Sequence, residues 1–409
     1  MQAATIVFDR IAKIVLKWQN GSLPEYELDV LNSLVLQDLL PTSMDQSTAL
    51  SVAVTRFRKL ALAVPKPVYA RSIVDGHGED EAVYVRGNHK TMTPERAPRR
   101  FLTAAATNVF SQPGSGRRQW ADALVHPNNT LTSRVMVNRV WAHLFGRGLV
   151  ATVDNFGAMG ERPTHPELLD HLSYRFIRDG WSLKRLIRKL VLSNTYRLST
   201  QPVVRSKRVD PLNQWLSHMP VRRLPAEAIR DSILAVSGRL QHHMFGPSVP
   251  ISLKTVTASR ARPRKDGPLD GAGRRSVYQE IRRNYLPGFL RAFDLPNASV
   301  TFGQRAVTNV PTQALALMND PFVIQQTSVW AKQVVGMNAS FKSRINHLHL
   351  SAYSRPATRR EQSRFRKILN SLTSQLKVRP SELNDLRVWQ AICHIMIGRK
   401  EFIFLIGDP

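Results

Sequence analysis

The chain has 409 residues with a hydrophobic share of 43%, and its 58 Lys and Arg against 30 Asp and Glu give a formal net charge of +28. This composition excludes wholesale disorder, and no apolar run approaches the roughly 20 residues of a membrane-spanning helix. The positive charge predicts attraction to polyanions such as nucleic acid, acidic polysaccharide or anionic lipid. A chain of this length needs more than one hydrophobic core, so two or three subdomains are expected.

Residues 1–67 are predicted to form a helical lead-in. Apolar residues recur there at helical spacing in three stretches, and Asn20 and Gly21 separate the first two. Asp9 and Lys13 interrupt the apolar residues near the start, and no small-residue cleavage site follows. The sequence therefore predicts no secretory signal peptide.

Residues 68–125 are predicted to contain a small β-hairpin followed by a long surface segment. Residues 68–70 and 82–86 have the β-branched and aromatic composition of strands, and a turn-rich stretch lies between them. Residues 93–120, rich in Pro, Arg, Gly and Ser, are expected to lie on the surface. The histidines of this region fit no familiar ligand spacing, so no metal site is predicted.

Residues 126–330 are predicted to form the core of a mainly α fold, and residues 331–409 its C-terminal helical portion. Overall we expect a multi-helix globular assembly with one or two small antiparallel β elements. Apolar residues at helical spacing predict helices that begin near residues 131, 166 and 182, and later ones that include a basic helix at 361–376. The one cysteine, Cys393, excludes an intramolecular disulfide, and its isoleucine neighbours predict that it is buried.

The ends of the first two central helices carry recognisable capping residues. Asn129 or Thr130 can accept hydrogen bonds from the free amides of the first helix. Gly146 permits the left-handed turn that ends it. Thr164 and Glu167 have the spacing of a capping box for the second helix.

Two loops of the core domain have unusual compositions. Residues 146–163 are rich in glycine, which implies a tightly folded loop of the kind that often carries function. Residues 252–275 are rich in Arg and Lys and predict a cationic flap that either clamps an anion or is poorly ordered. Residues 276–281, which follow the flap, are expected to form a strand.

A helix that begins after Pro225 places Glu227 and Asp231 four residues apart, on one face. Two carboxylates in this arrangement can serve acid–base chemistry. Arg223 and Arg230 lie close enough in sequence to neutralise them, so an ion-paired helix surface is the favoured interpretation.

A later helix is predicted to open at Pro311, where a proline in the first turn costs no hydrogen bond. Its apolar residues Ala314, Leu315 and Leu317 are expected to point inward. The polar residues of this stretch either bind a ligand or satisfy buried backbone groups, and the second role is favoured.

Short motifs follow one another in order along much of the chain. Their main members are Asn138-Arg139, Asp154-Asn155-Phe156-Gly157, Pro163-Thr164-His165-Pro166, Arg222-Arg223-Leu224, Glu227-Ala228-Ile229-Arg230-Asp231, Gln313-Ala314-Leu315 and Arg355-Pro356. Taken together, they resemble the domain-of-unknown-function family 1553, over roughly residues 68–406.

The resemblance implies a setting more than an activity. Members of that family are planctomycete domains found C-terminal to a cytochrome c module in exported proteins, and no catalytic residue is established for them. This chain has no C-x-x-C-H haem attachment motif. We therefore expect no cofactor in this chain, and either a shortened member or the C-terminal piece of a longer protein with haem upstream.

The sequence is compatible with three functions. The leading hypothesis is a non-catalytic binding or scaffold module that engages acidic polysaccharide, a partner subunit or the upstream cytochrome c module in an extracytoplasmic assembly. The alternatives are a hydrolase acting on carbohydrate and a nucleic-acid-binding protein, although G-x-S-x-G, H-E-x-x-H and Walker motifs are absent. The candidate binding residues are charged or hydrogen-bonding side chains: Asn138, Arg139, His143, Asp154, His165, Arg305, Gln313 and Asn319.

Overall fold

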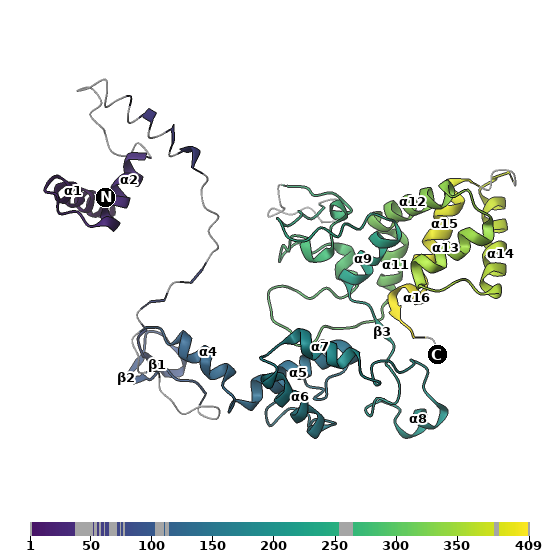
Figure 1. Ribbon diagram of the computed structural model, residues 1–409, viewed down its shortest axis with the longest axis horizontal. Coiled ribbons are helices and arrows are strands. Elements are labelled where there is room, and N and C mark those ends of the chain that lie inside the picture. The colour runs from purple at the N-terminus through teal and green to yellow at the C-terminus, as the bar shows by residue number, and fades with distance from the viewer. Residues whose placement is uncertain are drawn as a thin grey trace. The chain divides into compact units, whose positions relative to one another are not determined.

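The computed structural model describes residues 2–36, 78–102, 110, 114–252, 265–379 and 384–407, together with isolated residues between 52 and 76. In this part of the chain, helices dominate and the sheets are two small antiparallel pairs of strands (Figure 1). The prediction of a mainly α fold is confirmed. Within the same residues, no helix is both long enough and apolar enough to cross a bilayer.

The chain divides into two compact units, Met1–His77 and Gly78–Pro409. In the first unit, α1 (Gln2–Gln19) and α2 (Glu25–Leu36) contact each other. An ion pair of 2.9 Å between Lys17 and Glu27 links them, and Gly21 has the positive φ that the intervening turn requires. The predicted break at this glycine is confirmed, whereas part of the third predicted helix lies outside the described residues.

The second unit opens with a hairpin whose pairing differs from the predicted one. β1 (Glu81–Tyr84) pairs antiparallel with β2 (Met92–Ala97), across the short helix η2 (Val85–Gly87). The predicted partner of β1, residues 68–70, lies outside the described residues. Arg86 and Gly87 both have positive φ, which turns the chain straight back and pairs β1 with the strand that follows it.

Three helices, α5 (Thr130–Phe145), α6 (Pro166–Arg178) and α7 (Leu183–Val191), enclose the first hydrophobic core, and α4 (Arg117–Val125) precedes them. The predicted starts of all three are confirmed. Ser182 caps α7 by accepting a hydrogen bond from the Arg185 amide. α4 occupies part of the segment that was expected to be irregular surface.

Several local predictions for these helices need correction. The N-cap of α6 is His165, and Thr164 forms no capping box because its hydroxyl donates to the Leu149 carbonyl instead. In α7, the helical spacing of the sequence predicts that Leu186 and Leu190 point inward, and both are buried. The helical spacing of the sequence predicts that Leu183 and Ile187 also point inward, but both are about two-fifths exposed, because this short helix packs only one narrow side against α5 and α6.

The second hydrophobic core is formed by the helices after α8 (Val204–Val209). They are α9 (Ala226–Val236), α10 (Gly288–Ala292), α11 (Pro311–Asn319), α12 (Pro321–Gly336), α13 (Phe341–Tyr353), α14 (Arg359–Gln375), α15 (Leu386–Ile397) and α16 (Lys400–Ile403). Trp330 of α12 and Trp389 of α15 are almost fully buried in it. Cys393 is fully buried as predicted, and burial raises the pKa of its thiol. This core extends across residue 330, which the sequence suggested as a boundary.

Two further predictions in this region are wrong. The expected strand at 276–281 contains the short helix η5 (Ser276–Tyr278), after the similar turn η4 (Gly271–Gly273). The cause is Asp231, whose carboxylate accepts hydrogen bonds from the amide and the hydroxyl of Ser276 and holds this segment against α9. Of the three apolar residues of α11 that were expected to point inward, Ala314 and Leu315 are exposed and Leu317 is buried.

A two-stranded sheet joins the end of the chain to the segment before α9. β3 (Arg222–Arg223) pairs antiparallel with β4 (Phe404–Leu405), as Figure 1 shows beside α16. The Leu224 amide extends the pairing by donating to the Ile403 carbonyl at 2.8 Å. β3 thereby lies between the two hydrophobic cores, where its arginines line a cleft with apolar and basic side chains.

Candidate binding cleft

A cleft of about 550 Å³ lies between the C-terminal end of α5, β3, β4 and residues 303–307. Its apolar lining comes mainly from Phe145, Leu216, Phe293 and Phe404. Its basic lining includes the side chains of His143, Arg147, Arg222, Arg223 and Arg305. Since arginine greatly outnumbers acid here, the cleft favours a ligand with negative charge and some apolar surface.

Arg222 is the central basic side chain of this cleft. It also lines a second hollow of about 480 Å³, formed by residues 196–200 and 405–407, so the two hollows share this side chain. Its Nη1 donates to the backbone carbonyl of His143 at 2.6 Å, and its Nε is buried without an acceptor. Among the described residues, Arg222 therefore has no carboxylate to balance its charge.

The position of Arg222 depends on the glycine that ends α5. Gly146 has a φ of 83°, and a Cβ at this position would lie 2.8 Å from Cδ of Arg222. A side chain there would be strained by its own backbone and would also displace the arginine. The predicted left-handed turn at Gly146 is thus confirmed, and it gives the arginine the space it occupies.

Arg223, the next residue of β3, has a different role. Its side chain is 3% exposed, and its Nη2 lies 2.6 Å from a carboxylate oxygen of Asp294. Burial raises the pKa of Asp294, but hydrogen bonds from Thr308 and Arg223 outweigh this effect and hold the pKa below its ordinary value. Gln313 completes the cluster, since its amide donates to the Thr308 carbonyl at 3.1 Å. This network fixes the wall of the cleft.

Two exposed ion pairs border the cleft. Arg305 lies 2.7 Å from Glu227, and Arg147 lies 3.4 Å from Glu161. Pairs exposed to this degree contribute little to stability, typically ~1 kcal/mol or less. Both arginines can therefore exchange their carboxylate for an anionic ligand at low cost.

The glycine-rich loop 146–163 is held against α5 by Asn138. This fully buried side chain donates to the Val150 carbonyl and accepts from the Val150 amide, both at 2.9 Å. Further along the loop, Asp154 accepts from the Gly303 amide at 2.9 Å and lies 3.7 Å from Arg139. The loop thus contacts the segment that forms one wall of the cleft.

The eight predicted site residues therefore separate into groups. His143 and Arg305 line the cleft. Asp154 lies outside the lining but accepts a hydrogen bond from the amide of Gly303, which belongs to the cleft wall, and Arg139 lies near Asp154. Asn138 and Gln313 donate hydrogen bonds to backbone carbonyls. His165 packs beside Trp215, with ring centroids 5.4 Å apart. Asn319 is exposed at the end of α11, outside the cleft lining.

Sequence reasoning did not single out Arg222 or Asp294 as site residues. In the sequence, Arg222 stands out only as part of a motif, and Arg223 also as a possible partner of the carboxylates at 227 and 231. Adjacent residues of a strand face opposite sides, which is a signal that the two arginines have different surroundings. No pattern indicated a strand, because β3 is two residues long and its partner lies near the other end of the chain.

The carboxylates of α9 are engaged in separate contacts. Glu227 pairs with Arg305, and Asp231 binds Ser276 and lies 3.4 Å from Arg230. This arrangement supports the ion-paired interpretation of the helix, although Arg223 pairs with Asp294 instead of Glu227. In the described residues, no group of three or more His, Cys, Asp and Glu is placed to hold a metal ion.

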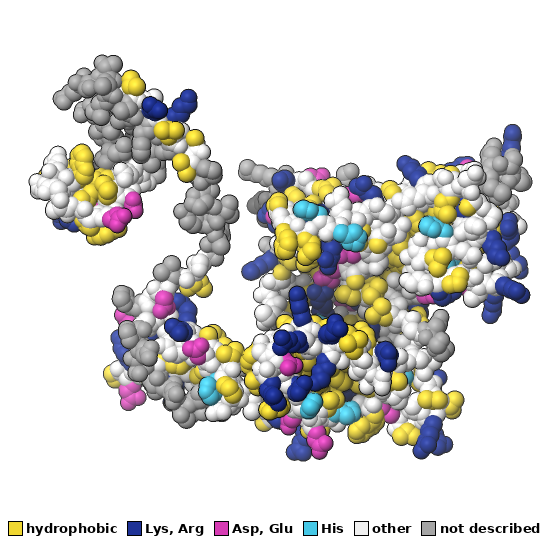
Figure 2. All heavy atoms as spheres, in the orientation of Figure 1, with side chains coloured by type: hydrophobic (Ala, Val, Ile, Leu, Met, Phe, Trp, Pro, Cys, Tyr) yellow, Lys and Arg dark blue, Asp and Glu magenta, His cyan; other side chains and the backbone are white. Residues whose placement is uncertain are grey.

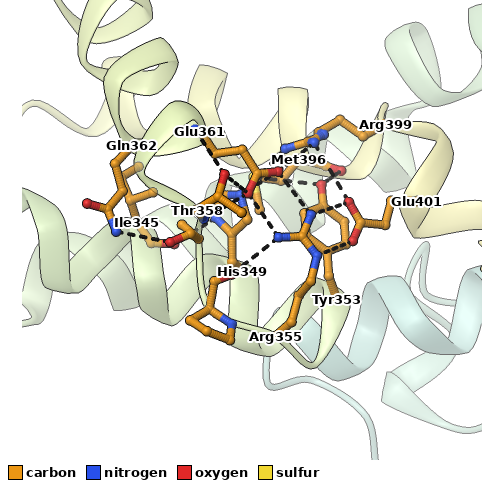
Figure 3. A network of polar contacts seen from close by, with 12 residues as sticks. Ile345, His349, Tyr353, Arg355, Thr358, Glu361, Gln362, Met396, Arg399 and Glu401 are labelled. Atoms are coloured by element: carbon orange, nitrogen blue, oxygen red, sulfur yellow. Dashed lines mark hydrogen bonds and ion pairs between the residues drawn. The ribbon is translucent and has the colours of Figure 1, made fainter. Parts of the chain in front are cut away.

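A second polar cluster joins α13, α14 and the C-terminal segment (Figure 3). Arg355 lies between two carboxylates, donating to Glu361 at 2.9 Å and to Glu401 at 2.6 and 2.8 Å. Glu361 also accepts from Arg399. The hydrogen bonds from Arg355 hold the pKa of Glu361 well below its usual range, so this carboxylate is a permanent charge that orders the fold.

Comparison with models of protein families gives a match over much of the chain. The model of a family described as PSD1, protein of unknown function (DUF1553), matches residues 116–369. This range includes α5, the loop 146–163, β3 and the 303–308 wall. No curated protein and no solved structure matches the chain.

Proposed function

This chain belongs to the PSD1 family of proteins of unknown function (DUF1553), and on that premise we propose that it is a non-catalytic binding module for an acidic polysaccharide. The polymer occupies the cleft and the adjoining hollow. In this proposal the module works in an exported planctomycete protein, next to a cytochrome c module that holds the haem. The chain itself carries no cofactor.

The observation that supports this proposal best is the position of Arg222. Its guanidinium borders both hollows, has no carboxylate partner among the described residues, and retains donors that no neighbour uses. A buried or half-buried cation without a counter-ion is costly, and an anionic group placed beside it relieves that cost. A ligand that occupies both hollows would contact Arg222 near its middle. An extended polymer can fill both hollows in this way, whereas a small molecule would fill only one of them.

The remaining lining fits the alternating character of an acidic sugar polymer. The aromatic and aliphatic side chains of Phe145, Leu216 and Phe404 offer apolar surface to the faces of sugar rings. Arg147 and Arg305 at the rim can bind carboxylate or sulfate groups when they leave their exposed acidic partners. The ligand's charge and its apolar faces therefore both find matching surfaces.

The surface near the cleft adds a long-range attraction. α7 exposes four basic side chains, Lys184, Arg185, Arg188 and Lys189, none of which pairs with a carboxylate in the described part of the chain. Figure 2 shows dark-blue side chains gathered over α7. Such a surface raises the local concentration of polyanions and speeds their association, most strongly at low salt.

The proposal is tested by titrating the purified chain with polygalacturonate and, in parallel, with a neutral polysaccharide of similar length. Replacing one charged contact of this kind is expected to weaken binding by about tenfold. We therefore expect Arg222→Gln to lower the affinity for the acidic polymer about tenfold. Arg208→Gln, which removes an equal charge from the exposed α8, should change it by less than about twofold.

Each competing result has a clear meaning. Equal affinity for the neutral polymer, or equal effects of the two variants, refutes the proposal. Tighter binding of single-stranded DNA with a steeper salt dependence favours the nucleic-acid alternative. New reducing ends, lost on substitution of a cleft residue, would establish the hydrolase alternative.

A further inference from the structure

A separate hollow of about 550 Å³ lies beside the first turns of α14 and shares no lining residue with the cleft. It is open to solvent and its lining is dominated by charge. The charged and polar residues that line it are Arg355, Thr358, Arg360, Glu361, Arg364 and Arg399. We call it the arginine hollow. Four guanidinium groups surround one carboxylate, so its lining carries a net positive charge.

The carboxylate in this hollow is already saturated with donors. One oxygen of Glu361 accepts from Arg355 and Arg399, and the other accepts from Arg355 and from Thr358. Figure 3 shows these contacts converging on Glu361. Glu361 therefore has no capacity left for the other two arginines of the hollow.

Those two arginines, Arg360 and Arg364, have no counter-ion in the described part of the chain. Both are exposed, and neither forms an ion pair or a side-chain hydrogen bond there. They lie four residues apart on α14, which places their side chains side by side on one face. Like charges at this spacing repel each other and destabilise the helix, unless an anion lies between them.

We infer that the arginine hollow binds a divalent tetrahedral oxyanion, namely a phosphate or sulfate group. Two neighbouring guanidinium forks offer parallel N–H donors that match two edges of such a group. The first turn of α14 adds a favourable field, because the positive end of the helix dipole lies at Thr358. A single carboxylate satisfies this set less well, since it has only two oxygens and one negative charge.

The same helix provides a matched control. Lys367 is exposed on α14 but does not line the hollow. Arg366 also lies outside it, with its guanidinium 4.0 Å from the ring centroid of Phe341. Lys367→Gln thus removes one positive charge from α14 and leaves the hollow intact.

The experiment is isothermal titration calorimetry of the full chain with inorganic sulfate and inorganic phosphate at low ionic strength, with acetate as the monovalent comparison. We expect saturable binding of one dianion per chain and about tenfold weaker binding to Arg360→Gln or Arg364→Gln. Lys367→Gln should change the affinity less than twofold. Arg364→Lys keeps the positive charge but loses the paired N–H donors of the guanidinium group, so its loss of affinity should lie between these two values.

Three outcomes overturn the inference: no saturable binding, acetate binding as tightly as sulfate, or Lys367→Gln weakening binding as much as Arg364→Gln. Because both arginines are exposed, the variants are expected to fold, and circular dichroism checks this. Thermal unfolding adds a second readout, since the dianion should raise the Tm of the wild type more than that of a variant with both Arg360→Gln and Arg364→Gln. The cleft variant Arg222→Gln should bind the dianion normally, so this result is independent of the proposed polysaccharide site.

Discussion

Replacing Glu361 with glutamine removes the carboxylate that accepts hydrogen bonds from both Arg355 and Arg399. The amide has nearly the shape of the carboxylate, so the packing changes little. The variant loses both ion pairs, and its NH₂ group faces donors that the carboxylate oxygen had accepted. We therefore expect a loss of stability that comes from electrostatics and hydrogen bonding.

The magnitude follows from the exposure of the partners. Removing one member of a buried ion pair costs about 3–5 kcal/mol. The side chain of Glu361 is 13% exposed, but Arg355 and Arg399 are 26% and 28% exposed. Solvent screens part of the effect, so we expect the free energy of unfolding to fall by about 2–3 kcal/mol. Glu401→Gln should cost less, about 1 kcal/mol, because only Arg355 donates hydrogen bonds to it.

The same variant has a defined pH dependence. In the folded chain the pKa of Glu361 lies below its ordinary value of 4.5, so the unfolded chain takes up a proton first as the pH falls. The stabilisation is therefore complete above about pH 5 and decreases as the pH falls through the acid range. Since glutamine does not titrate, the stability difference between wild type and Glu361→Gln should shrink between about pH 5 and pH 3.

Guanidinium chloride unfolding, followed by circular dichroism at several pH values, measures both quantities. Glu95→Gln is the control, because this exposed residue of β2 should change stability by less than about 0.5 kcal/mol. A loss below about 0.5 kcal/mol for Glu361→Gln at pH 7, or a difference that stays constant down to pH 3, would refute the reasoning.

Two further predictions concern buried groups. Asn138→Ala leaves the amide and the carbonyl of Val150 without their hydrogen-bond partner, so the free energy of unfolding should fall by about 2–4 kcal/mol in the same assay. A loss under about 1 kcal/mol would contradict the conclusion that Asn138 holds the loop 146–163 against α5. Burial raises the pKa of the Cys393 thiol, so this cysteine should resist Ellman's reagent in the folded protein and react once guanidinium chloride unfolds it. Rapid reaction in native buffer would show that the second core opens at Cys393 far more often than its packing implies.

Helix positions were predictable because their signals are local. Asn129 caps α5, Ser182 caps α7 and Pro311 opens α11, each within a few residues of the helix it starts. The capping box at Thr164 failed because a loop carbonyl fifteen residues earlier in the chain accepts its hydroxyl. Spacing alone does not reveal such a competitor.

The pairing of the strands could be predicted from the sequence even less well than the helix caps. β1 was recognised by its composition, but its partner is set by the turn that follows it. β3 and β4 carry no pattern of their own, since each is only two residues long, and they meet because the second core brings the end of the chain back to Arg222. Long-range pairing of this kind depends on the packing of the whole unit.

For the site, the sequence by itself determined which side chains are polar and which motifs they belong to. Only the tertiary structure decided that the side-chain amide of Asn138 is hydrogen-bonded to the backbone of Val150 and that Arg223 is neutralised by Asp294. It also decided that Arg222 has no carboxylate partner in the described residues. The physical reason is that the role of a polar side chain depends on which groups desolvate it and which neutralise it. Those groups lie in distant segments, and folding alone brings them together.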